Sequence, residues 1–129
     1  MIAYVVAAIV LRCVARGELP DPACTPGAVD PSAFVCGQPT RERRHVDEAM
    51  RRRVFAEYDV PWAERSAYEV DHLVPLCLGG SNELANLWPE RSHAEKDRVE
   101  ARLCRRVCAG EVSLDWAQRV MMIDWRQAR

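Results

Sequence analysis

The stretch "YEVDHLVPLCLGG", from Tyr68 to Gly80, decides the fold prediction for this chain. Its apolar residues are typical of a half-buried β-strand, yet Asp71 and His72 stand side by side in the middle of it. Two titratable side chains in such a strand cost free energy unless something uses or neutralises them. The pair therefore marks the candidate functional site.

The flanking residues predict a β-hairpin. A strand is expected over residues 68–76, ended by Pro75 and by a turn that contains Gly79 and Gly80. A second short strand around residues 84–88 would return along the first after a longer loop.

Helical spacing of apolar residues predicts three helices around this hairpin. The first is expected over residues 40–58, with Thr40 as its cap, and the second over residues 93–109, with Gly110 as its stop. The third is expected over residues 113–126 after the N-cap Ser113. Its apolar stripe is predicted to be core: Leu114, Ala117, Val120, Met121 and Trp125.

Composition fits one domain and gives no global electrostatic argument for nucleic-acid binding. The chain has 129 residues, 49% of them apolar, and a formal net charge of -1. Of the 18 basic residues only Lys96 is a lysine, which leaves 17 arginines. Arginine suits bidentate phosphate contacts, although a GC-rich coding sequence gives the same preference.

The first helix is locally basic, because residues 41–53 contain six arginines and three acids, a charge of +3. Arg43, Arg44 and Arg51 are therefore candidate nucleic-acid contacts. A solvated helix face is the alternative.

Residues 1–17 have features of a secretory signal peptide. Residues 2–11 form an apolar stretch, and Ala15 and Gly17 have the spacing of a cleavage site. No basic residue precedes the stretch, so a docked N-terminal helix is the alternative, and the stretch is short for a membrane span. We expect a secreted or periplasmic protein with no membrane contact in its mature form, or a cytoplasmic one if this segment is not a signal peptide.

Six cysteines also favour an oxidising compartment. Residues 18–40 are rich in Pro and Gly, and Cys24 with Cys36 is the easiest pair to imagine as a staple for them. Cys104 and Cys108 share a helix face and should bond outward, one of them to Cys77. A zinc site made by these last three cysteines and a histidine is the alternative. Cleavage after Gly17 would remove Cys13 and leave an odd number of cysteines.

The stretch "VDHLVPLCLGGSNELANLWPE", from Val70 to Glu90, resembles the HNH nucleases, whose active site is a ββα-metal unit. The flanking "LPDPACTPGAVDP" and "KDRVEARLCRRVCAG" are similar to small, cysteine-containing secreted proteins of that family. The resemblance extends over residues 19–125. It implies an α+β protein in which residues 41–129 form one domain, with a hairpin-plus-helix core surrounded by further helices.

The resemblance also implies a chemistry: divalent-metal-dependent endonuclease cleavage of DNA. His72 would be the general base that activates water, and its ordinary pKa leaves it neutral at physiological pH. Asp71 would bind one divalent ion, Mg²⁺ or Mn²⁺ first and Zn²⁺ or Ni²⁺ as alternatives. Asn86 would clamp the loop through its side-chain amide.

The third metal ligand departs from the family pattern. The family places a His or Asn about nine residues after the middle Asn, and here that position is Glu95, whereas the imidazole of His93 comes two residues earlier. We expect His93 to be the ligand, with Glu95 as the alternative and no third ligand as the last option. Glu69 lies two residues before Asp71, where it could supplement the site.

One structural condition follows, because neighbours in a regular strand point to opposite faces. Asp71 and His72 can serve one metal site only if strong twist or a bulge brings them together, so an irregularity is predicted at this pair. Regular alternation through Val70 to Leu73, with Asp71 and His72 on opposite faces, would contradict this assignment. The rival is a catalytically silent nucleic-acid-binding or metal-stabilised module that keeps the fold.

Overall fold

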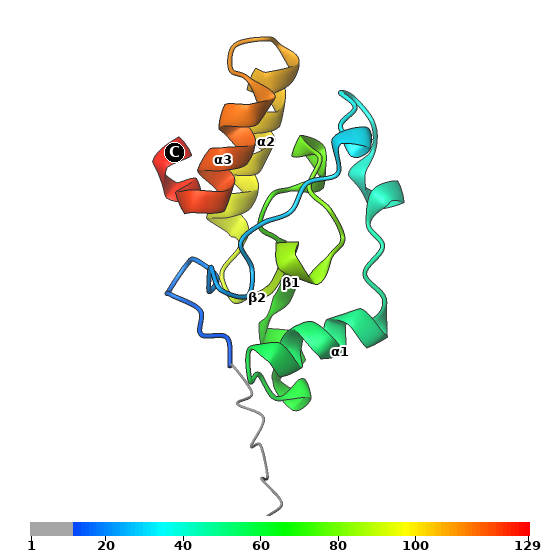
Figure 1. Ribbon diagram of the computed structural model, residues 1–129, viewed down its shortest axis with the longest axis vertical. Helices are drawn as coiled ribbons and strands as arrows, with labels where there is room; N and C mark the ends of the chain where they lie inside the picture. The colour runs from blue at the N-terminus through cyan, green and yellow to red at the C-terminus, as the bar shows by residue number, and fades with distance from the viewer. Residues whose placement is uncertain (1–11) are drawn as a thin grey trace, which may run out of the picture.

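The computed structural model describes residues 12–129 as a small α+β fold (Figure 1). Its helices and strands are α1 (Glu48–Glu57), β1 (Glu69–His72), β2 (Leu87–Glu90), α2 (Ala94–Cys108) and α3 (Leu114–Asp124). The β1–β2 hairpin lies in the middle of the molecule, with α2 and α3 side by side at one end and α1 at the other. A hairpin followed directly by a helix is the element order that the sequence predicts.

The hairpin is regular. Its antiparallel register pairs Glu69 with Glu90, Val70 with Pro89, Asp71 with Trp88 and His72 with Leu87. Because cross-strand partners share a face, Asp71 lies with Trp88 on one face and His72 lies with Leu87 on the other. The irregularity predicted at Asp71 and His72 is therefore wrong.

β1 ends earlier and β2 begins later than the sequence predicts. β1 ends at His72 instead of residue 76, because Pro75 has no N–H for the ladder and residues Leu76–Leu78 turn into a 3-10 helix. β2 begins at Leu87 instead of residue 84, because Leu84–Asn86 forms a second 3-10 turn. The connection between the strands is thus a long structured loop.

The helix prediction at residues 40–58 is right in type but wrong at its start. The carboxylate of Asp47 accepts a hydrogen bond from the Met50 N–H at 2.8 Å and caps α1 there. Thr40 begins only a separate 3-10 turn, Thr40–Arg43.

The other two helices begin and end close to the predicted residues. Ser113 caps α3 by accepting from the Trp116 N–H at 3.1 Å, and Gly110 follows α2 with φ +73°. The main core lies between α2, α3 and the loop. Four of the five predicted stripe residues are buried in this core, and Leu114 is partly buried against them: Ala117, Val120, Met121 and Trp125.

Three disulfides connect the chain: Cys13–Cys24, Cys36–Cys108 and Cys77–Cys104. The predicted bond from α2 to Cys77 is present, and both helix cysteines bond outward. The predicted Cys24–Cys36 pair is wrong, because each of these thiols bonds to a different segment. The alternative zinc site is also wrong, since all its cysteines are oxidised.

Residues 18–40 pack as part of the same domain. The Gly27 N–H donates to the Ala85 carbonyl at 2.9 Å, and the Asp30 N–H donates to the Gly79 carbonyl at 2.8 Å. This segment is therefore fastened to the hairpin loop and not closed on itself by its own cysteines.

The predicted apolar stretch at residues 2–11 lies outside the described residues. Cys13, however, is buried and bonded to Cys24, so cleavage after Gly17 would leave Cys24 without its partner. Along residues 12–129, no helix is both long enough and apolar enough to span a membrane.

Disulfide mapping tests this connectivity. Non-reducing peptide mass spectrometry should recover the three cross-linked pairs and no Cys24–Cys36 peptide. Replacing Cys36 and Cys108 together by serine should cost about 4 kcal/mol, more than the ~3 kcal/mol for the Cys13 and Cys24 pair, because it opens the longer loop. Equal losses in thermal unfolding would contradict that ranking.

Candidate functional site

Asn86 holds the hairpin loop closed. Its Oδ1 accepts from the Val74 N–H at 2.9 Å, and its Nδ2 donates to the carbonyls of Val74 at 3.0 Å and Ser81 at 2.9 Å. The side chain is fully buried, so these bonds satisfy backbone groups that water does not reach. The cross-loop bonds expected for Asn86 are thus present.

The loop also requires a glycine at position 80. A Cβ on Gly80 would lie 1.8 Å from the Val74 carbonyl oxygen and 3.0 Å from Asn86 Nδ2. Close approach of the backbone, and not left-handed backbone geometry, therefore fixes this residue. The predicted turn role of the glycine pair holds for Gly79, whose φ is +78°.

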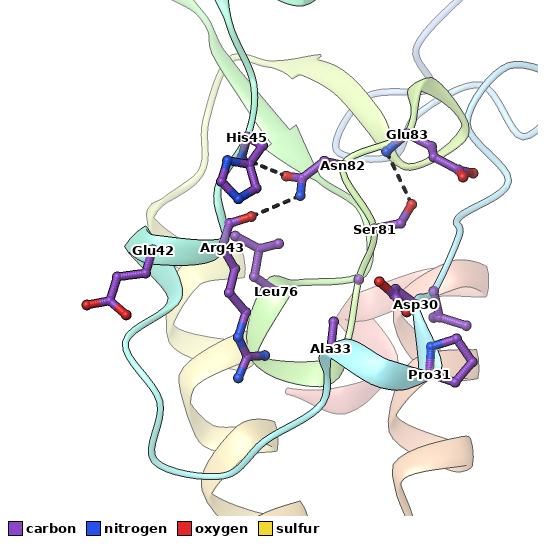
Figure 2. A pocket seen from close by; sticks show the side chains of 12 residues that line it. Asp30, Pro31, Ala33, Glu42, Arg43, His45, Leu76, Ser81, Asn82 and Glu83 are labelled. Carbon is purple, nitrogen blue, oxygen red and sulfur yellow. Dashed lines mark hydrogen bonds between the residues drawn. The ribbon is translucent and has the colours of Figure 1, made fainter.

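A second amide, Asn82, fixes the proton on His72. Asn82 Nδ2 donates to the Arg43 carbonyl at 2.9 Å, and Asn82 Oδ1 accepts from the His45 N–H at 3.1 Å, so its orientation is settled (Figure 2). The same Oδ1 lies 2.9 Å from His72 Nε2, which must then be the donor. In the neutral ring, Nδ1 carries the free lone pair.

The environment of His72 keeps it neutral. Burial lowers its pKa below the ordinary value, and the hydrogen bond to Asn82 only partly opposes this. Nδ1 is buried and has no hydrogen-bond partner among residues 12–129. His72 is therefore a neutral imidazole with one oriented N–H and one unused acceptor.

Asp71 is neutralised by a lysine that the sequence analysis missed. Lys96 Nζ lies 2.7 Å from Asp71 Oδ2, and the Trp88 indole Nε1 donates to the same oxygen at 3.3 Å. Lys96 also donates to the His72 carbonyl at 3.0 Å and forms an ion pair with Glu100. Its side chain is fully buried on the core face of α2 beside Val99 and Leu103.

Glu90 adds a buried carboxyl to this face. Burial raises its pKa to about 9, and the nearby charge of Asp71 acts in the same direction. In the described part of the chain neither Glu90 oxygen has a hydrogen-bond partner, although Asp71 lies close enough to influence the charge of Glu90. Glu90 is thus protonated at neutral pH.

The other expected metal ligands point elsewhere. His93 is half exposed, and its Nδ1 lies 2.8 Å from Asp97 and 3.3 Å from Glu69, contacts that raise its pKa. Glu95 pairs with Arg129 at 2.9 Å. Glu69 therefore contacts His93 instead of supplementing Asp71.

These positions do not fit a divalent metal shared by Asp71 and His93. Asp71 Oδ2 already contacts the Lys96 ammonium and the Trp88 indole, so a divalent ion on that oxygen would lie against a buried positive charge, and His93 contacts Asp97 and Glu69 instead. Within residues 12–129, no three His, Cys, Asp or Glu side chains are arranged to hold an ion. No step of the chemistry is therefore assigned to a metal.

A cavity of about 630 Å³ opens beside the hairpin loop, and its lining includes Asn82, the hydrogen-bond partner of His72 (Figure 2). Asn82, Arg43 and His45 form part of its wall, with Asp30 and Glu83 farther along. Arg44 lies close enough to His72 to lower its pKa by charge repulsion. Of the predicted contacts, Arg44 thus lies near His72, whereas the Arg43 guanidinium donates to the Val35 carbonyl and to Gln38.

The third predicted contact, Arg51, belongs to a different surface. Three guanidinium groups surround the half-buried Trp62 ring, with Arg51, Arg52 and Arg65 at 5.7, 4.2 and 5.1 Å from its centroid. Arg91 lies 5.0 Å from the neighbouring Tyr68 ring. We call these six residues the arginine–aromatic surface: Arg51, Arg52, Trp62, Arg65, Tyr68 and Arg91.

Much of this positive charge is available. Arg52 pairs with Glu48, but within the described chain Arg51, Arg65 and Arg91 have no acidic partner. Trp62 could not be identified from the sequence, because a single tryptophan near Pro61 indicates only a loop. Its surroundings depend on how α1 packs against the hairpin.

The chain matches no family model, no curated protein and no solved structure.

Glu90 makes stability depend on pH. A carboxyl whose pKa rises on folding stabilises the fold fully below the unfolded pKa, near 4.5, and loses that contribution as pH rises toward about 9. A rise of about 1.5 in the pKa of Glu90, one third of the full difference, corresponds to about 2 kcal/mol of unfolding free energy. Thermal melts from pH 5 to 9 should therefore show a larger loss of stability in the wild type than in Glu90→Gln. Parallel pH profiles would contradict the assignment of Glu90 as a buried acid.

Proposed function

We propose that the protein is an endonuclease of the ββα type that hydrolyses DNA phosphodiester bonds, with His72 as general base. The observation that carries the proposal is the state of His72. A general base at neutral pH needs an unprotonated nitrogen and a fixed ring orientation, and burial with the Asn82 hydrogen bond supports both.

In this proposal the nucleophile is a water molecule that His72 Nδ1 deprotonates. Because Nδ1 is buried and has no hydrogen-bond partner within residues 12–129, the surrounding loop has to open on DNA binding before water reaches it. His72 takes the proton as the water oxygen attacks phosphorus. Arg44, the neighbouring cation, stabilises charge on the phosphate oxygens. Asn82 and Asn86 are positioning residues that hold the ring and the loop.

The arginine–aromatic surface provides the proposed contact to the DNA backbone. Guanidinium groups bind phosphates in a bidentate manner, and aromatic rings tolerate any base that stacks on them. Binding led by phosphate contacts should be weakly sequence-specific and should weaken with salt.

A second candidate is binding of nucleic acid without cleavage. The regular hairpin favours it, because Asp71 and His72 lie on opposite faces and cannot jointly form the metal site that the HNH resemblance implies. The arginine–aromatic surface would serve this function equally well.

Secretion remains part of the proposal. Three disulfides are typical of proteins that fold in oxidising compartments, and they suit a nuclease that acts outside the cell.

Plasmid cleavage tests the catalytic proposal. We expect the oxidised wild type to nick or cut supercoiled plasmid, and His72→Gln to lower the rate by at least ~100-fold, because the general base is lost. His93→Ala is the matched histidine control and should leave the rate unchanged. Circular dichroism melts of each variant establish that it is folded.

The other outcomes are equally informative. Cleavage that persists in folded His72→Gln would contradict the role of His72. Cleavage that requires Mg²⁺ and is abolished by both EDTA and His93→Ala would restore the metal-dependent mechanism. DNA binding without cleavage would select the second candidate.

Binding through the arginine–aromatic surface has its own test. Replacing Arg51, Arg65 and Arg91 by alanine should weaken binding of a labelled oligonucleotide at least ~10-fold. The slope of log binding constant against log salt concentration should also become shallower by about 0.7–0.9 for each phosphate contact that is lost. Fluorescence anisotropy at several salt concentrations measures both. The control is the double variant Arg106→Ala and Arg119→Ala. It removes two surface arginines at the α2–α3 end, each of which forms an ion pair with a carboxylate. Equal affinity of the two variants would contradict the proposed surface.

A further inference from the structure

We infer that the ammonium group of Lys96 replaces the divalent metal ion beside Asp71, so that this cation site is supplied by the chain itself and takes no metal. The inference goes beyond the proposed function, because it concerns the charge that holds β1 against α2 and stands whether or not the protein cleaves DNA.

The Lys96 ammonium has the oxygen contacts that a bound cation would have. An ammonium group has three N–H donors, and Lys96 Nζ has three oxygen partners, namely Asp71, Glu100 and the His72 carbonyl. The donors of Lys96 are therefore fully used, and its ammonium occupies the position of a cation beside Asp71 Oδ2.

The buried charge of Lys96 also excludes a divalent metal ion from Asp71. Lys96 is fully buried and anchored on the core face of α2, so its charge does not move to solvent without unpacking the first turns of that helix. A divalent ion bound to Asp71 would lie against this ammonium and repel it in a low-dielectric interior. The metal and Lys96 are therefore mutually exclusive at Asp71.

The amino-acid composition supports the same inference. Lys96 is the one lysine in a chain with 17 arginines. A guanidinium is planar and presents its donors in a fixed fork, whereas an ammonium is a compact point charge that can direct three donors to oxygens around it. The exception to the arginine preference thus falls at the position where a small, ion-like cation is required.

Metal binding to the wild-type chain is the direct test. The oxidised full-length protein is dialysed against Mn²⁺, freed of loose ions, and its metal content is measured by plasma mass spectrometry beside Asp71→Asn. We expect far less than one Mn²⁺ per chain in both proteins. We also expect equal wild-type melting temperatures in EDTA and in Mn²⁺, since a ligand that binds the folded state would raise the melting temperature.

A gain-of-function variant sharpens the test. Lys96→Asn removes the ammonium and offers an oxygen ligand beside Asp71 and Glu100. We expect it to melt below the wild type in EDTA and to recover by several degrees in Mn²⁺. The control Arg119→Asn removes an exposed cation on α3 and should show no response to Mn²⁺.

One stoichiometric Mn²⁺ in the wild type that is lost in Asp71→Asn would overturn the inference. This readout needs only the wild type and an isosteric variant, so it decides the question even if Lys96→Asn does not fold. It is also independent of activity. A protein that binds no Mn²⁺ and cleaves no DNA would uphold the inference while overturning the proposed function.

Discussion

The buried ion pair between Lys96 and Asp71 is the constraint on which the rest of the site depends. It joins the first turns of α2 to β1, and its third bond, to the His72 carbonyl, fixes the strand at the next residue. Removing one partner of such a pair typically costs about 3–5 kcal/mol, because the other charge stays buried and unpaired. The protonated Glu90 fits the same environment, since a further negative charge beside Asp71 is suppressed.

The regular hairpin divides the polar groups between two faces. On one face the charges of Asp71, Lys96 and Glu100 compensate one another inside the protein. On the other face His72 stays neutral and faces the loop that Asn82 and Asn86 organise. Asn82 connects this side of the hairpin to the cavity, because it both binds His72 and lines the cavity wall.

Local patterns predicted much of the fold. The α2 and α3 helices follow from periodicity and from Ser113 and Gly110, whose capping chemistry acts over a few residues. The start of α1 was missed because Asp47 competes with Thr40 for the cap, and the Cys24–Cys36 pair was wrong because chain proximity does not determine which segments pack together. The pairing of Lys96 with Asp71 could not be predicted either, because the two residues are on different elements. A single lysine on the apolar face of a helix does, however, indicate a buried charge that needs a partner.

Crystals grown in Mn²⁺ and measured at the manganese absorption edge test the central claim most directly, because anomalous scattering locates the ion without reference to activity. We expect no anomalous peak at Asp71 and a Lys96 ammonium in contact with that carboxylate. A peak bonded to Asp71, with Lys96 displaced, would contradict it and return Asp71 to the role of metal ligand.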